Sequence, residues 1–281
     1  MTDYFNVRLT YAMGITDIDD KIINKAKLSG YNTWEEMQMM VRKLENDFFH
    51  DMDRLNVKRP DSVLRVTEHI PDILAYIQKL IQQNNAYIAA DGVYFDFSSL
   101  KHEYDKFGCT NIPTEEEIIS HENHENNPAS SSSSHSSSDM FVWDSPWGKG
   151  RPGWHIECSA MTHTLFGKHI NIHSGGVDLK FPHHTNEIAQ CEAHNCSDHN
   201  AWVDTWLHLG HLHIEGRKMS KSLKNFISIH DYLHSNITSQ PSDDFRLYCL
   251  SYKYYTTLTY STIRIQEATK LRYKFESFFS S

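Results

Sequence analysis

The sequence lacks several features, and each absence argues against a class of protein. It has no apolar run of the length that a membrane span needs. Its first ten residues, MTDYFNVRLT, are neither rich in arginine nor a basic stretch followed by an apolar one, so they do not resemble a targeting peptide. The five cysteines are odd in number and show no pairing pattern, which favours reduced thiols in an intracellular compartment. Positive charge is not in excess either: with a net charge of −9, any contact with a nucleic acid has to come from a local patch.

The length and composition are those of a globular protein. With 281 residues, 39% of them hydrophobic, the chain can bury a core as one large domain or two smaller ones. Residues 114–139 differ, because they are acidic and then almost entirely serine, without apolar periodicity. Such a segment cannot bury enough surface to offset its ordering entropy, so we expect a flexible insertion.

The first hundred residues predict strands that alternate with helices. Apolar residues alternate as in a strand at Val7, Leu9, Tyr11 and Met13. Thr16 or Asp17 can cap the helix that follows, and Thr33 with Glu36 forms a capping box for a second helix. The apolar stripe of that second helix comprises Met37, Val41, Leu44, Phe48, Met52 and Leu55. A further helix over 70–81 and a hairpin over 87–97 complete a pattern typical of an α/β domain.

Three residues in the second half can hold a metal. A helix is predicted from Trp154, which carries Cys158, and another from Pro182, which places His183 and Glu187 on one face. A thiolate, an imidazole and a carboxylate are ligands that zinc accepts. A surface histidine with an ion-pair partner is the alternative interpretation of His183 and Glu187.

Two other segments can bind a nucleotide. Gly175 and Gly176 follow a predicted strand and permit close approach of a ligand to the backbone, with Asp178 available for ribose hydroxyls. The string Lys218–Ser222, KMSKS, combines two lysines with two hydroxyls and can form an anion cradle for a triphosphate. A solvated basic turn is the alternative for that string.

Four segments together resemble cysteinyl-tRNA synthetase: Ile15–Ile23, Gly153–Met161, His173–Glu187 and Lys218–Ser222. The resemblance implies an α/β fold, the class I synthetase Rossmann-like parallel sheet with an inserted connective region. It also implies ATP-dependent ligation of cysteine to tRNA-Cys through cysteinyl-adenylate, with magnesium accompanying ATP and one zinc ion as cofactor. We expect a monomer without membrane contact.

The same resemblance assigns residues. It implies that zinc is held by Cys158, His183 and Glu187 and grips the substrate thiolate. It implies a cysteine pocket lined by Thr16, Trp154 and His173. It implies an ATP site made by Gly175, Gly176, Asp178, Lys218, Ser220 and Lys221, in which Lys218 and Lys221 act catalytically on the phosphates. Serine differs from cysteine by one atom, so a zinc–thiolate bond discriminates better than pocket shape.

The chain also departs from the family pattern. Family members begin earlier, with a strand that carries a zinc-ligand cysteine and then the HIGH motif, whereas here no cysteine precedes Cys109. We therefore expect a fragment, with a sheet incomplete at the N-terminus and only the start of a C-terminal helical region. The string His208–His211 imitates HIGH in its letters alone. The predicted division is 1–113 and 140–230 for the catalytic domain, 114–139 for the insertion and 231–281 for the helical stem-contact region.

The sequence leaves alternatives open for the function of the chain and for its compartment. The fragment can be a cysteine–tRNA ligase, a related ligase that joins cysteine to an amino-sugar acceptor, or a non-catalytic remnant that binds zinc or a nucleotide. The sequence of residues 143–147, WDSPW, resembles the organellar branch of the cysteinyl-tRNA synthetase family more closely, which favours a mitochondrion over the cytoplasm.

Overall fold

The computed structural model describes most of the chain: residues 2–97, 106–107, 141–195, 201–214, 216–219, 224–235 and 237–280. The predicted insertion 114–139 and two predicted ATP-site residues, Ser220 and Lys221, lie outside these ranges. The chain forms two compact units. Unit 1 comprises Met1–Arg42, Pro60–His173 and Leu179–Thr205, and unit 2 comprises Lys43–Arg59, Ser174–Asp178 and Trp206–Ser281.

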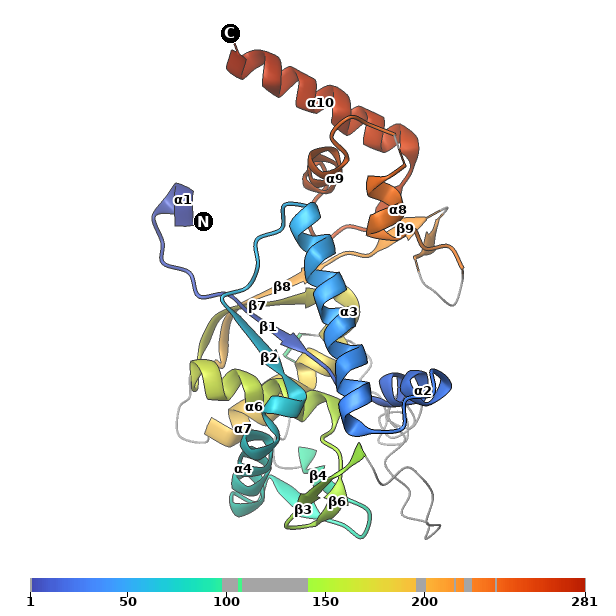
Figure 1. Ribbon diagram of the computed structural model, residues 1–281. Helices are drawn as coiled ribbons and strands as arrows, with labels where there is room; N and C mark the ends of the chain where they lie inside the picture. The colour runs from blue at the N-terminus through green and yellow to red at the C-terminus, as the bar shows by residue number, and fades with distance from the viewer. Residues whose placement is uncertain are drawn as a thin grey trace. The chain divides into compact units, whose positions relative to one another are not determined.

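Unit 1 contains a parallel strand pair, as the predicted α/β fold requires. Strand β1 (Ala12–Ile15) pairs with β2 (Ser62–Arg65) in parallel, and the connection between them contains α2 (Asp20–Leu28) and α3 (Trp34–Arg54) (Figure 1). The strand predicted from Val7 is wrong in its first half, because Val7 and Leu9 lie in an irregular segment with 47% of each exposed. Alternating apolar residues predict an extended segment with one apolar face. A β-strand forms only where a neighbouring strand also supplies hydrogen-bond partners.

Helices α2 and α3 correct two details. The cap of α2 is Asp19, whose Oδ1 accepts a hydrogen bond from Ile22 N at 2.5 Å, rather than Thr16 or Asp17. The capping box of α3 is confirmed, since Thr33 Oγ1 and the Glu36 carboxylate accept from each other's backbone N–H groups. Its predicted stripe holds at the buried Met37 and Val41 and fails at the exposed Leu44 and Phe48.

The rest of unit 1 places the helices that carry the predicted metal ligands. Helix α4 (Ile70–Gln82) packs against α6 (Trp154–Phe166) and α7 (Thr185–Asn195) over the buried Ile73, Leu80 and Met161. Smaller elements are α1 (Thr2–Phe5), η1 (Val66–Glu68), hairpin β3 (Ala86–Ile88) with β4 (Val93–Phe95), and hairpin β5 (Trp143–Ser145) with β6 (Gly148–Gly150). The predicted hairpin over 87–97 and the predicted helix over 70–81 are therefore confirmed.

Strands β7 (Ile170–Gly176) and β8 (Val203–Leu209) pair with each other, and each has residues in both units. After β7 come the short helices η4 (Val177–Leu179) and η5 (Lys180–His184), and η5 leads directly into α7.

Unit 2 has its own sheet and core. Its three strands are ordered β10 (Arg217–Lys218), β9 (Leu212–Ile214) and β11 (Leu258–Tyr260), with β9 antiparallel to β10 and parallel to β11. Helices α8 (Ile229–Leu233), α9 (Pro241–Leu250) and α10 (Thr262–Ser280) enclose a core built on Tyr232, Tyr248, Ile265 and Ala268. Within the described residues, no helix is both long enough and apolar enough to cross a bilayer.

Candidate metal centre and nucleotide turn

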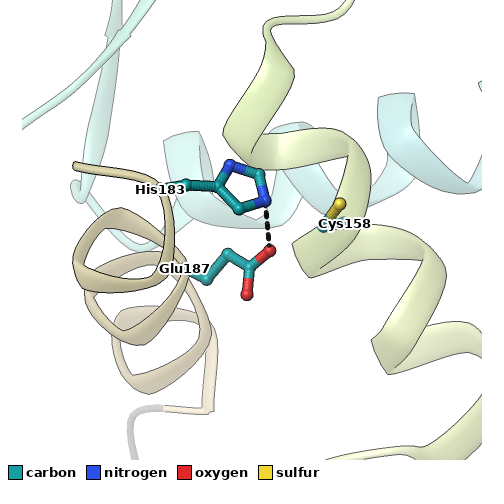
Figure 2. A group of neighbouring side chains, drawn as sticks. All are labelled: Cys158, His183 and Glu187. Atoms are coloured by element: carbon teal, nitrogen blue, oxygen red, sulfur yellow. Dashed lines mark ion pairs between the residues drawn. The ribbon is translucent and has the colours of Figure 1, made fainter. Parts of the chain in front are cut away.

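The three predicted metal ligands come together in unit 1. Cys158 lies near the start of α6, His183 lies in η5, and Glu187 lies in the first turn of α7 (Figure 2). One donor atom from each residue lies within 4.8 Å of the other two. The predicted pairing of His183 and Glu187 on one face is confirmed, with 2.8 Å between His183 Nε2 and Glu187 Oε1.

Glu187 is the centre of this cluster. Its side chain is fully buried, and its Oε2 lies 2.7 Å from Nε2 of His173. Burial raises the pKa of Glu187, but the imidazoles of His173 and His183 outweigh it and hold that pKa well below the ordinary value. Glu187 Oε1 is buried as well, and it lies against Nε2 of His183. A carboxylate oxygen and an imidazole nitrogen are both groups that can accept a cation.

Cys158 has the opposite protonation preference. Burial first, and then the negative charge of Glu187, raise the pKa of the Cys158 thiol well above its ordinary value. The thiol is therefore protonated near neutral pH when no cation is bound. A divalent cation beside it reverses this preference, because a coordinating thiol loses its proton.

A neighbouring histidine controls how His183 presents its ring. His155 Nδ1 lies 2.8 Å from His183 Nδ1, and the Trp154 ring stacks on the His183 ring with 4.3 Å between centroids. Burial, assisted by His183, lowers the pKa of His155 to about 3, so His155 is neutral and one of the two Nδ1 atoms has to donate. If His183 Nδ1 donates, its Nε2 presents a lone pair toward Glu187 and Cys158, which is the tautomer that a metal ligand requires.

The donor set fits zinc. Sulfur, imidazole nitrogen and carboxylate oxygen are ordinary zinc ligands, and three protein ligands leave a position for a substrate. The contacts from His155 to His183 and from His173 to Glu187 are those that orient ligands around a metal. A second group with donors as close together, His173, His184 and Glu187, shares the same carboxylate.

Two of the three residues predicted to bind cysteine lie against this cluster. Trp154 contacts His183 and His173 contacts Glu187, as described above. Thr16 follows β1 and hydrogen-bonds with Glu157, the neighbour of Cys158 on α6. Burial, with Asp17 and Asp19 nearby, raises the pKa of Glu157 to about 9, so this carboxyl group is neutral at pH 7.

The predicted nucleotide residues within the described ranges meet in unit 2; they are Gly175, Gly176, Asp178 and Lys218. Gly175 and Gly176 end β7, and a Cβ added to Gly176 would lie 2.5 Å from Asp178 Oδ1, so a side chain there would displace the Asp178 carboxylate. Asp178 Oδ2 lies 3.0 Å from Lys218 Nζ, and Asp178 Oδ1 lies 3.9 Å from His211 Nδ1. Although partial burial raises the pKa of Asp178, Lys218 and His211 lower it overall. The Asp178 carboxylate therefore lies beside both the glycine turn and Lys218, the first lysine of KMSKS.

Sequence reasoning missed three residues in or next to the metal cluster: His155, His184 and Glu157. His155 precedes Cys158 by three residues on a predicted helix, so helical spacing alone places it on the same face. His184 and Glu157 are direct neighbours of predicted ligands, and only their burial distinguishes them.

Comparison with known proteins finds one matching family model and several similar proteins. The family model "tRNA synthetases class I (C) catalytic domain" matches residues 1–270. The chain is 41% identical over 277 residues to the probable mitochondrial cysteine--tRNA ligase of Xenopus tropicalis, covering 98% of this chain and 46% of that protein. It is 40% identical over 291 residues to the cytoplasmic cysteine--tRNA ligase of Dictyostelium discoideum, covering 99% and 43%. It is 41% identical over 275 residues to the cysteine--tRNA ligase of Actinobacillus succinogenes, covering 95% and 56%. The chain thus spans about half the length of the curated relatives it matches.

Proposed function

Since this chain belongs to the class I tRNA synthetases (C), we propose that it activates cysteine with ATP and transfers the cysteinyl group to tRNA-Cys. In the first step the cysteine carboxylate attacks the α-phosphate of ATP and pyrophosphate leaves. In the second step a ribose hydroxyl at the tRNA 3′ end attacks the adenylate carbonyl and AMP leaves. The observation that carries this proposal is the convergence of Cys158, His183 and Glu187 in a chain whose relatives are named cysteine--tRNA ligases.

Those three residues would hold a zinc ion, and the ion would supply a bond to the substrate thiolate that a serine hydroxyl cannot match. Around it, His155 fixes the ring of His183, and His173 fixes the carboxylate of Glu187. The indole of Trp154 covers one face of His183 and excludes water from it. These contacts keep the donors in place before substrate arrives, as discrimination between cysteine and serine requires.

Lys218 would act on the phosphates of ATP. In this structure its ammonium lies against the Asp178 carboxylate, and both side chains are about half exposed. An exposed ion pair of this kind is weak, so Lys218 can leave Asp178 for another anion. An ATP ribose on the Gly175–Asp178 turn would occupy the Asp178 carboxylate and free Lys218 for the triphosphate. Lysine then stabilises the charge that grows as pyrophosphate departs. We assign Ser220 and Lys221 to the same cradle on the KMSKS resemblance.

ATP–pyrophosphate exchange tests the proposal. The zinc-loaded full chain should exchange label in the presence of cysteine and much less with serine. Charging of tRNA-Cys, compared with an amino-sugar acceptor, then separates the two ligase hypotheses. A folded, zinc-loaded chain without cysteine-dependent exchange would contradict the proposal and leave the non-catalytic remnant.

The relatives include mitochondrial and cytoplasmic proteins. We propose a mitochondrial location, because the sequence of residues 143–147 resembles the organellar branch of the family.

A further inference from the structure

Two exposed tyrosine rings stand on the turn between α9 and β11. Tyr254 is 54% exposed and Tyr255 is 56% exposed, and their centroids lie 5.3 Å apart in an edge arrangement. Lys253 Nζ lies 5.8 Å from the centroid of Tyr255. Exposed aromatic rings with a neighbouring cation are the means by which proteins stack unpaired nucleobases.

The turn that carries these rings is held in place by its backbone. Gly210 N donates to the carbonyl of Tyr254 at 2.9 Å, and Thr256 N and Oγ1 both donate to the carbonyl of Lys253. A Cβ at Gly210 would lie 2.1 Å from the Thr256 carbonyl oxygen, so the two segments approach as closely as a glycine allows. The rings are therefore presented on a fixed backbone, which lowers the entropy cost of binding.

This turn lies at the same end of the sheet as the KMSKS segment. Leu258, just after the turn, pairs with Leu212, and Met219 N donates to the carbonyl of Leu212 from the other side. Neighbouring strands lie about 4.8 Å apart, so Met219 and Leu258 are separated by roughly 10 Å across β9. The turn that carries the tyrosines and the start of KMSKS are therefore neighbours at one end of this sheet, so one strand of nucleic acid can contact both.

The local charge favours a polyanion. The turn 251–257 and strands β9, β10 and β11 contain Arg217, Lys218 and Lys253 but no aspartate or glutamate; an acid nearby is Asp178, which pairs with Lys218. This contrasts with the net charge of −9 for the whole chain. It is a local basic patch of the kind that a nucleic-acid partner needs.

We propose that Lys253, Tyr254 and Tyr255 form a stacking platform for an unpaired nucleotide at the 3′ end of tRNA. The inference rests on the proposed function, because it takes the partner to be tRNA. Tyrosine rings bind the base by its face, so the platform accepts any base and contributes affinity rather than sequence choice.

Binding of two RNAs to the full chain, followed by fluorescence anisotropy, tests the platform. The RNAs are a tRNA-Cys transcript and the same transcript trimmed of its unpaired 3′ nucleotides. Replacing both Tyr254 and Tyr255 by alanine should weaken binding of the intact transcript about ten-fold and leave binding of the trimmed one unchanged. Replacing both by phenylalanine keeps the rings and should preserve affinity. Tyr87→Ala is the matched control, since Tyr87 is also 54% exposed and faces another tyrosine, Tyr94, on the β3–β4 hairpin.

Several outcomes would overturn the platform. One is equal binding of the intact transcript by the wild type and the alanine variant, and another is an equal loss for both transcripts. If the rings instead drive self-association in sedimentation, the surface is a protein contact. Cysteine-dependent exchange by the wild type needs no tRNA, so it decides the proposed function separately.

Discussion

His194 should make the metal-free protein less stable as the pH falls from 7.5 to 5.0. Its ring is 3% exposed and stacks on Tyr76 with 3.8 Å between centroids, while Lys79 Nζ lies 3.4 Å from Nδ1. Burial, followed by Lys79 and His163, lowers the pKa of His194 to about 4 from 6.5. The unfolded chain therefore binds a proton at pH 5 that the folded chain does not.

The sign and size follow from this difference. Because the folded-state pKa is the lower one, the contribution of His194 is fully present above pH 6.5 and is lost as the pH falls toward 4. Between pH 7.5 and 5.0 the loss is about 2 kcal/mol in the free energy of unfolding. That is a substantial part of the 5–15 kcal/mol, roughly, by which folded domains are stable.

Urea unfolding at the two pH values, in the presence of a chelator, measures the effect. The variant His194→Phe keeps an aromatic ring on Tyr76 but cannot titrate, so its stability should fall by about 2 kcal/mol less than that of the wild type. His50→Phe, at an exposed position, should behave as the wild type does. Equal pH dependence of the wild type and His194→Phe would refute the reasoning.

Three further predictions concern the metal centre and unit 2. Cys158→Ser should lower the zinc bound per chain in metal analysis after dialysis, and unchanged zinc would count against the assigned ligands. His173→Ala removes the partner of Glu187 Oε2 and should weaken zinc binding about 10–100-fold in a chelator competition; His169→Ala, which removes an exposed partner of Asp204, is the control. Arg272→Met leaves the fully buried Asp244 without its ion-pair partner and should cost about 3–5 kcal/mol in urea unfolding; a loss below about 1 kcal/mol would argue that Asp244 protonates instead.

Local patterns predicted the elements well wherever local interactions decide them. The capping box at Thr33 and the helix over 70–81 depend on residues within one or two turns, and both are as expected. The cap of α2 was predicted wrongly because a distant residue decides it. Asp17 accepts hydrogen bonds from Thr67 N at 2.9 Å and Thr67 Oγ1 at 2.5 Å, so Asp19 is the acid left for the cap.

The predicted stripe of α3 is wrong at Leu44 and Phe48 for a related reason. Phe49 is 6% exposed, whereas Phe48 is 40% exposed. A shift of one residue rotates the buried face of a helix by about 100°. Local spacing cannot choose between two adjacent phenylalanines when the partner surface comes from elsewhere in the chain.

The metal cluster could be predicted as a set of residue types, but its electrostatics could not. The residue types Cys, His and Glu do not give the protonation state of each side chain. In the folded chain, the neighbouring imidazoles keep Glu187 anionic, and burial keeps Cys158 neutral. Two imidazoles lie against the Glu187 carboxylate, and burial keeps the Cys158 thiol protonated. A bound divalent cation would ionise that thiol, so metal binding and loss of the thiol proton would be one event. On the proposed function, a substrate thiol in the same cluster would ionise beside the cation, whereas an alcohol, which ionises far less readily, would not.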